Sequence, residues 1–159
     1  MENKAVIIDA TRSPIGIKNG EMVGIRPDDL AAQVVKGLME RNNKVTSDQV
    51  EDLVMGCAFP EGPQGMLIGR SVVALAGLPQ TVPAKVVNRF CGSAMDALHQ
   101  VSTAIESGDI EVGIAAGVED MFSIPPGGFA PDFHPELAEQ EYYIGMGETA
   151  ENLANDGNI

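Results

Sequence analysis

Positive charge is absent from the second half of this 159-residue chain. Residues 90–159 contain no lysine or arginine, whereas residues 1–89 contain all ten, balanced by ten acidic residues. The other thirteen acidic residues therefore account for the whole net charge of −13. A negatively charged surface repels phosphate backbones, so we expect no nucleic-acid partner. If the protein binds an anionic cofactor, the cation that meets it must come from residues 1–89 or from outside the chain. The same charge is also consistent with simple solubility.

Cysteine is scarce, with only Cys57 and Cys91 in the chain. The first residues, Met1 to Lys4, lead directly into apolar residues 5–8 and lack the basic start, apolar stretch and cleavage site of a signal peptide. Both features favour a reducing, cytoplasmic location, where a disulfide is not expected. No apolar run is long enough to span a bilayer, so we expect no membrane partner.

Apolar segments with the character of strands alternate with segments of helical periodicity. The expected strands cover residues 4–11, 52–59, 84–88 and 112–117, and the expected helices cover residues 26–43, 66–75 and 93–108. Strands and helices in this order imply βαβ crossovers and a mainly parallel sheet, which is an α/β fold. The last strand is almost continuously apolar, as expected of a strand that is covered on both faces.

Beyond Gly117 the alternation stops. Residues 124–131 are rich in proline and glycine and predict a loop. Residues 136–143 are expected to form a short acidic helix, and another helix is expected to begin at Met146. About forty residues thus follow the last strand and have no obvious strand to pair with. We therefore expect an α/β domain that is incomplete at its C-terminal end.

Cys91 lies where the expected strand 84–88 meets the expected helix 93–108. A cysteine at a helix start faces unpaired backbone N–H groups and the positive end of the helix dipole. Both favour the thiolate, which is the nucleophilic form. Gly92 beside it leaves space for a substrate to approach the sulfur. Spacing alone leaves two interpretations of Cys91, a nucleophile or a small buried hydrophobic residue.

Four short motifs resemble those of one enzyme family. The segment NRFCGS at residues 88–93 resembles the nucleophile segment of the thiolases, which make or cleave 3-ketoacyl-CoA. Three further segments are similar to family motifs in the same order: ATRSPIG at 10–16, GVEDM at 117–121 and MGETAEN at 146–152. Val118 and Asp120 depart from the family's Gly-Gly-x-Glu-x-Met pattern. Because the motifs are spread over nearly the whole chain, it is identified as the amino-terminal part of a thiolase.

The resemblance implies that Cys91 accepts an acyl group. In thiolysis, free CoA then takes this acyl group; in Claisen condensation, the enolate of acetyl-CoA attacks it. The backbone N–H of Cys91 would help to stabilise the oxyanion that forms on the carbonyl. Met146 matches a methionine that lines the family's acyl pocket, although ordinary packing is an equally good interpretation. Coenzyme A thioesters are the implied substrates, with no metal and no permanently bound cofactor.

The match covers only the first half of the family's fold. By comparison with the family, residues 1–120 form an N-terminal half-domain that lacks its last strand, and residues 121–159 begin an inserted loop region. The family's second half supplies a histidine, a second cysteine and an asparagine, and none of their motifs occurs here. His134, His99 and Cys57 stand in other sequence contexts, and the last two are expected to be packing residues.

Two functions of different classes follow from this partial match. In the first, the chain is the amino-terminal part of a thiolase-type acyltransferase. Alone it is inactive and needs a separate C-terminal half, because no general base is visible in it. In the second, it is a non-catalytic thiolase-like module that acts by self-association. A half-domain exposes apolar surface that the missing half would cover, so a homodimer or larger homo-oligomer is expected.

Overall fold

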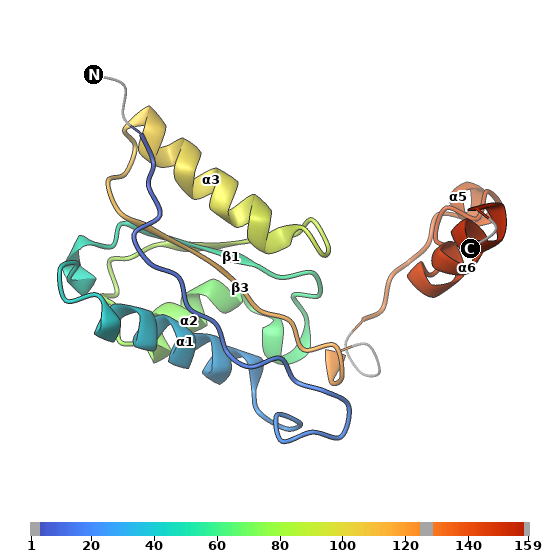
Figure 1. The fold of residues 1–159 in the computed structure, drawn as a ribbon, viewed down its shortest axis with the longest axis horizontal. Coiled ribbons are helices and arrows are strands. Elements are labelled where there is room, and N and C mark those ends of the chain that lie inside the picture. Colours follow the sequence, from blue (N-terminus) through green and yellow to red (C-terminus); the bar gives the residue numbers. More distant parts are fainter. Residues whose placement is uncertain (1–3, 125–128, 158–159) are drawn as a thin grey trace. The chain divides into compact units, whose positions relative to one another are not determined.

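The computed structural model describes residues 4–124 and 129–157. The chain divides into two compact units, Met1–Phe129 and Ala130–Ile159, whose positions relative to each other are not determined (Figure 1). Among the described residues, the first unit contains a three-stranded sheet with helices packed on it, and the second contains two short helices. All the strands of the sheet therefore belong to the first unit.

The sheet of the first unit is parallel. It consists of β1 (Asp52–Gly56), β2 (Ala84–Val87) and β3 (Gly113–Gly117) in the order β2-β1-β3 (Figure 1). Leu53 of β1 pairs with Ala84 on one side and with Ile114 on the other. The helices of this unit are α1 (Pro27–Arg41), α2 (Ile68–Leu75) and α3 (Ser93–Ser107), with short 3-10 turns η1 (Ser47–Gln49) and η2 (Gly62–Gln64). The α/β fold with a parallel sheet and crossover helices is confirmed.

Successive side chains of β1 point to opposite faces of the sheet and build a core on each face. Leu53 and Met55 are fully buried in the cluster formed with α1 and α2, which cover one face (Figure 1). Val54 points the other way and packs with Ala97 and Val101 of α3, which covers the opposite face. After Asp52 the central strand has no polar side chain, as expected of a strand whose two faces are both covered by helices.

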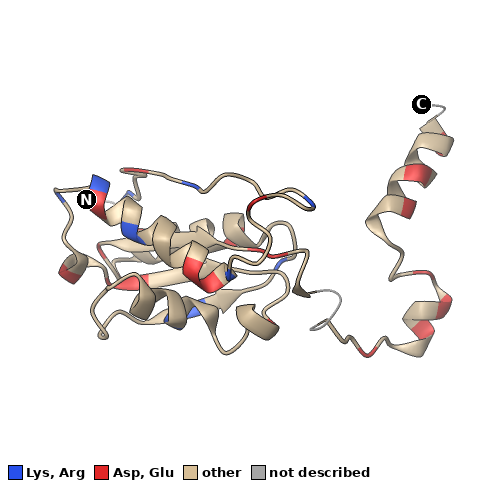
Figure 2. Cartoon of the chain, turned by 90° about the horizontal axis from the view of Figure 1, so that it is seen from below, with Lys and Arg blue, Asp and Glu red and all other residues tan. Residues whose placement is uncertain are grey.

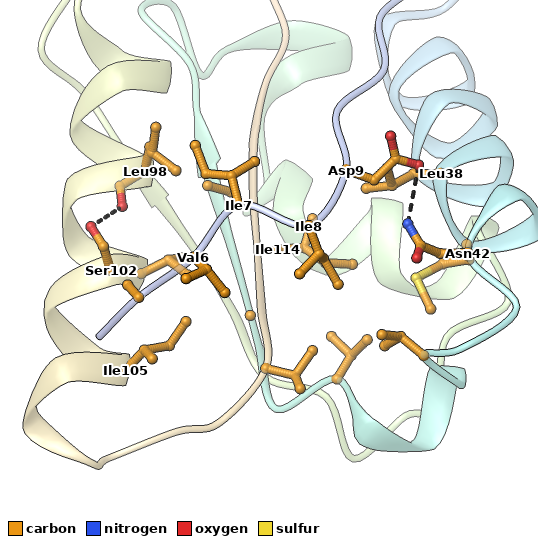
Figure 3. A pocket seen from close by; sticks show the side chains of 18 of the residues that line it. Val6, Ile7, Ile8, Asp9, Leu38, Asn42, Leu98, Ser102, Ile105 and Ile114 are labelled. Atoms are coloured by element: carbon orange, nitrogen blue, oxygen red, sulfur yellow. Dashed lines mark hydrogen bonds between the residues drawn. The ribbon is translucent and has the colours of Figure 1, made fainter. Parts of the chain in front are cut away.

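The first expected strand is not part of this sheet. Residues 4–11 form no strand, so the described sheet has three strands and not four. The segment lies over a cavity of about 340 Å³ that side chains of α1, α3 and β3 also line (Figure 3). Asp9 accepts hydrogen bonds from Arg41 and Asn42 at the end of α1, at 2.9 and 3.0 Å. Side-chain contacts therefore hold the segment, and its largest apolar residues stay 63–73% exposed: Val6, Ile7 and Ile8.

Helix α2 begins at Ile68, two residues later than its apolar pattern indicates. Met66 and Leu67 have φ angles of 50° and 61°, in the left-handed region of the backbone. Residues in this conformation cannot belong to a right-handed helix, and bulky L residues adopt it at a cost. Met66 and Leu67 continue the apolar pattern of the helix although their backbone is not helical. Periodicity alone therefore places the start of α2 two residues too early.

The second unit contains a helix in each of the two places expected, α5 (Pro135–Glu139) and α6 (Met146–Gly157). Helix α5 ends four residues before the expected Tyr143, and Glu141 beyond it has a left-handed φ of 55°. Phe133 and Tyr143 stack with ring centroids 4.4 Å apart, and the backbone N–H of His134 donates to the Tyr143 hydroxyl at 3.2 Å. The sequence of this unit contains aspartate and glutamate but no lysine or arginine (Figure 2). It therefore provides no Lys or Arg cation for an anionic ligand.

Residues 125–128, in the middle of the expected loop 124–131, lie outside the described residues. Phe129, the last residue of the first unit, meets the Phe59 ring edge-on, with ring centroids 4.9 Å apart. Within the described ranges, the structure has no helix that is both long and apolar enough to cross a bilayer.

Candidate functional site

Cys91 lies in the turn between β2 and α3, at the carboxyl end of the parallel sheet. This end is where open α/β sheets usually bind their ligands. The Cys91 side chain is exposed, whereas Cys57 is buried. The interpretation of Cys91 as a buried hydrophobic residue is therefore wrong, and the same interpretation of Cys57 is confirmed.

The turn that carries Cys91 is held by its own side chains. Phe90 has a left-handed φ of 45°, and its N–H donates to Asn88 Oδ1 at 2.9 Å. Ser93 Oγ accepts from the Arg89 N–H at 2.9 Å and donates to the Phe90 carbonyl at 2.6 Å. These bonds offset the cost of the unfavourable backbone conformation and place Cys91 immediately before the first turn of α3.

Two glycines allow the first turn of α3 to lie directly on the sheet. A Cβ added at Gly56, the last residue of β1, would lie 2.4 Å from both the Ser93 carbonyl carbon and the Ala94 nitrogen. A Cβ at Gly117, the last residue of β3, would lie 2.6 Å from Ala94 Cβ. Side chains at these strand ends would push the helix away, so the position of Cys91 depends on glycine at both.

The electrostatic surroundings of Cys91 combine a helix N-terminus with one nearby cation. Gly92 is the N-cap residue of α3, and because glycine has no side chain, the first turn of this helix lacks a side-chain cap. The exposed Arg89 guanidinium lies 3.7 Å from the Asp96 carboxylate in the first turn. An exposed pair at this distance contributes little to stability, which leaves Arg89 available to an anionic ligand. The arrangement leaves the Cys91 side chain open to solvent beside a helix N-terminus, with Arg89 able to meet an anionic group of a substrate.

Glu119 joins the loops that follow β1 and β3. Its carboxylate accepts hydrogen bonds from the N–H groups of Ala58 at 2.6 Å and Phe59 at 3.2 Å, and from Gln64 Nε2 at 2.8 Å. The strand expected over 52–59 ends early because these N–H groups bond to a side chain and not to a neighbouring strand. The sequence identifies Glu119 only as part of the GVEDM motif, and it gives no clear indication of a role for Gln64. The one available sign is that Gln64 is the only amide side chain in the glycine-rich loop 62–65.

Cys57 is suited to packing and not to nucleophilic chemistry. Burial, and secondly the nearby Glu119 carboxylate, raise the pKa of the Cys57 thiol to about 12. Its Sγ lies 3.8 Å from Glu119 Oε1. A thiol in this environment stays protonated and inaccessible at neutral pH. The two cysteines should therefore differ sharply in reactivity.

Iodoacetamide at a pH of about 8, close to the ordinary pKa of a thiol, is expected to label the folded chain once, on Cys91. After unfolding in urea the chain should take two labels, because Cys57 becomes accessible and its pKa returns to the ordinary range. Intact mass measures both results, and a Cys91→Ser variant should take no label while folded. Labelling of Cys57 in the folded chain would contradict the burial described above.

Two of the other candidate residues, Met146 and His134, belong to the second unit, whose position relative to the Cys91 turn is not determined. Met146 is the first residue of α6, in the second unit, and its side chain is 73% exposed. Its role in an acyl pocket stays a prediction. His99 lies on an exposed position of α3, so the expectation that it packs is wrong, and His134 precedes α5 in the second unit. The described residues contain no group of three or more His, Cys, Asp or Glu side chains able to hold a metal ion.

Comparison with known proteins gives a consistent result. Residues 5–159 match the family described as thiolase, N-terminal domain. The chain is 41% identical over 154 residues to a 3-ketoacyl-CoA thiolase of Bacillus subtilis (strain 168), covering 95% of this chain and 39% of that protein. It is 44% identical over 151 residues to a 3-ketoacyl-CoA thiolase of Aliivibrio salmonicida (strain LFI1238), covering 93% of this chain and 39% of that protein.

A third relative carries a different substrate in its name. It is a beta-ketoadipyl-CoA thiolase of Pseudomonas putida, 38% identical over 168 residues, with 94% of this chain and 42% of that protein covered. The chain thus spans about two fifths of the length of these relatives, at 39–42% of each. Since the thiolase match extends over nearly all of its residues, this chain belongs to the thiolase family, in the part that corresponds to the N-terminal domain.

Proposed function

We propose that this chain is the acyl-accepting part of a thiolase-type acyltransferase, with Cys91 as the nucleophile. The observation that carries the proposal is the exposed Cys91 thiol before the first turn of α3, at the carboxyl end of the parallel sheet. Relatives named 3-ketoacyl-CoA thiolase support a coenzyme A thioester as the substrate. Coenzyme A is then a substrate that comes and goes, and the chain holds no permanently bound cofactor or metal.

In thiolysis, the Cys91 thiolate attacks the ketone carbonyl of a 3-ketoacyl-CoA, and the new S–C bond creates an oxyanion. Collapse of the oxyanion breaks the C–C bond and releases the acetyl-CoA enolate, which takes up a proton. The thiol of free CoA then accepts the acyl group and regenerates the cysteine. The backbone N–H of Cys91 stabilises the oxyanion, and one such donor is generally worth about 3 kcal/mol.

The proton transfers need groups from outside the described site. The two histidines of the chain, His99 and His134, make no described hydrogen bond to Cys91 through their side chains, and a general base is needed to activate thiol and enolate. We propose that a C-terminal half supplies this base, in the same polypeptide or as a partner. The chain alone is expected to show negligible thiolase turnover.

Intact mass after incubation with acetoacetyl-CoA tests the proposal. The parent chain is expected to gain one acetyl group over a long incubation, because buffer can slowly take up the thiol proton for a single acylation, whereas rapid turnover needs a positioned base. The Cys91→Ser variant, with a poorer nucleophile at the same place, should gain none. A folded parent chain that stays unmodified, or an equal adduct on the variant, would refute Cys91 as the acyl acceptor.

A second function, a non-catalytic module acting by self-association, has its own supporting observation. β2 is an edge strand of the described sheet, and two large apolar side chains near it are well exposed, Phe90 at 64% and Met95 at 76%. Such surface favours pairing with a second copy. The two functions differ in one result: a stable homodimer that forms no acyl adduct supports the module, and adduct formation supports the acyltransferase.

The domain division stays part of this proposal. Residues 1–120 would form an N-terminal half-domain that lacks its last strand, and residues 121–159 would begin the inserted loop region. Limited proteolysis is the direct measurement. Cleavage near residue 120 that leaves a folded N-terminal fragment would support the division.

A further inference from the structure

Two glutamates tie β1 to β3, one at each end of the strands. Glu51 precedes β1, and its carboxylate accepts from the N–H groups of Glu111 and Val112, which precede β3; the bond to Val112 is 3.2 Å. Glu119 follows β3, and its carboxylate accepts from the N–H groups of Ala58 and Phe59, which follow β1. The two contacts have the same chemistry and lie at opposite ends of a parallel strand pair.

Only the Glu119 contact continues to the turn that carries Cys91. The Ala58 N–H donates to Glu119 at 2.6 Å, and the Ala58 carbonyl accepts from Asn88 Nδ2 at 2.9 Å. The other end of the same amide, Asn88 Oδ1, accepts from the Phe90 N–H at 2.9 Å. A continuous set of hydrogen bonds therefore connects Glu119 to the residue immediately before Cys91.

Phe90 is the residue whose position most needs this support. Its φ of 45° is unusual for a bulky side chain, and the residue is 64% exposed. Its ring has one tilted contact, with the Phe59 ring at a centroid distance of 6.3 Å, so hydrogen bonds must supply much of what holds its backbone. The Asn88 side chain fixes the Phe90 N–H, and Ser93 fixes its carbonyl. If Asn88 shifts, Phe90 can leave the left-handed region, and the Cys91 N–H and thiol then change direction.

We propose that Glu119 is a positioning residue for Cys91, acting through Ala58 and Asn88. The inference rests on the proposed acyl transfer for its functional consequence, although the hydrogen-bond path stands on geometry alone. Gln64 assists by donating to Glu119 at 2.8 Å and to the Phe59 carbonyl at 2.8 Å, which keeps the carboxylate aimed at the loop after β1. A change at Glu119 should therefore alter the chemistry of a thiol that it does not touch.

The test compares Glu119→Gln with Glu51→Gln in the whole 159-residue chain. Glutamine keeps the size of the side chain, but its amide nitrogen is a donor and cannot accept from a backbone N–H. Glu119 uses both carboxylate oxygens, so glutamine there must lose at least one bond to a backbone N–H or to Gln64. Glu51 accepts both of its bonds through Oε2 alone, so the amide oxygen of Glu51→Gln can keep them, and this variant removes the charge with little change in stability. The rate of acetyl transfer from acetoacetyl-CoA to Cys91 should fall about tenfold in Glu119→Gln, the effect of roughly one hydrogen bond, and stay within about twofold of the parent in Glu51→Gln.

Two further variants test the path itself. Asn88→Ala should slow acetyl transfer at least as much as Glu119→Gln does. If Glu119 acts through Asn88, the double variant should be no slower than Asn88→Ala alone, because the two changes interrupt the same path. Additive losses in the double variant would overturn the proposed route.

Hydrogen exchange of the Phe90 amide, measured by NMR, decides the inference without any acyl chemistry. It should speed up about tenfold in Glu119→Gln and in Asn88→Ala and stay unchanged in Glu51→Gln, because only the first two release this N–H. Equal effects of the two glutamate variants on exchange would overturn the positioning role. If the parent forms no acyl adduct, the proposed function fails for this chain, and the exchange result still supports or overturns the path.

Discussion

Replacing Gly56 by alanine is expected to lower the free energy of unfolding by about 3 kcal/mol, at the upper end of overpacking costs. The added Cβ would lie 2.4 Å from the Ser93 carbonyl carbon and 2.4 Å from the Ala94 nitrogen. Both are backbone atoms of the first turn of α3, so no side-chain rotation can relieve the contact. The helix start must move away from β1, and the neighbouring Cys91 must move with it.

Gly37→Ala is the matched control for this prediction. Gly37 lies inside α1, and a Cβ there would meet no atom within 4 Å. Alanine is the better helix former, so this variant should gain about 0.5–1 kcal/mol. Urea unfolding followed by far-UV circular dichroism measures both changes, and a loss of 3 kcal/mol lowers the midpoint by about 1–3 M. An unchanged midpoint in Gly56→Ala would show that α3 does not lie this close to the sheet.

Replacing Gln64 by leucine is expected to cost about 4 kcal/mol of stability, from several buried polar groups that lose a partner at once. Gln64 is fully buried, and its amide makes three hydrogen bonds. It donates to the Phe59 carbonyl and to Glu119 at 2.8 Å each, and accepts from the Asp120 N–H at 2.5 Å. Leucine fills a similar space but satisfies none of these groups.

Gln33→Leu provides the comparison, because Gln33 is exposed on α1 and the change there removes no described contact. Its stability should stay within about 0.5 kcal/mol of the parent. The two tyrosines both lie in the second unit. If each unit unfolds independently, tyrosine fluorescence should change with urea concentration in the same way in all variants. A Gln64→Leu variant as stable as Gln33→Leu would mean that the buried amide contributes no net stability.

Residue patterns predicted the fold class well because the helices and the central strand are built from local periodicity. The alternation in β1 places Leu53 and Val54 on opposite faces, and the spacing of Ala97 and Val101 identifies the buried face of α3. The start of α3, and with it the place of Cys91, follows from the strand, turn and helix pattern around residue 91. These features need no knowledge of distant contacts.

The N-terminal segment shows where periodicity stops being sufficient. Its apolar residues 5–8 predict burial, but burial is possible either in a strand ladder or by side-chain contact over a cavity. In the structure β1 and β3 pair with each other along their whole length, whereas residues 4–11 add no strand: Val6, Ile7 and Ile8 stay largely exposed, and Asp9 holds the segment to the end of α1. β3 is an edge strand of the described sheet, and no local pattern in residues 4–11 records whether they pair with that edge.

The sequence by itself determined the family, the α/β alternation, the charge division and the identity of Cys91 as the residue to examine, because each is carried by residue type and local spacing. Only the tertiary structure decided that Cys91 is exposed, that Gly56 and Gly117 admit the start of α3, and that Glu119 reaches Asn88 through Ala58. These contacts join residues about twenty to sixty positions apart, from Ala94 with Gly117 to Ala58 with Glu119. The pairing of such distant residues depends on how the strands are ordered and how closely the helix packs, which sequence spacing does not encode.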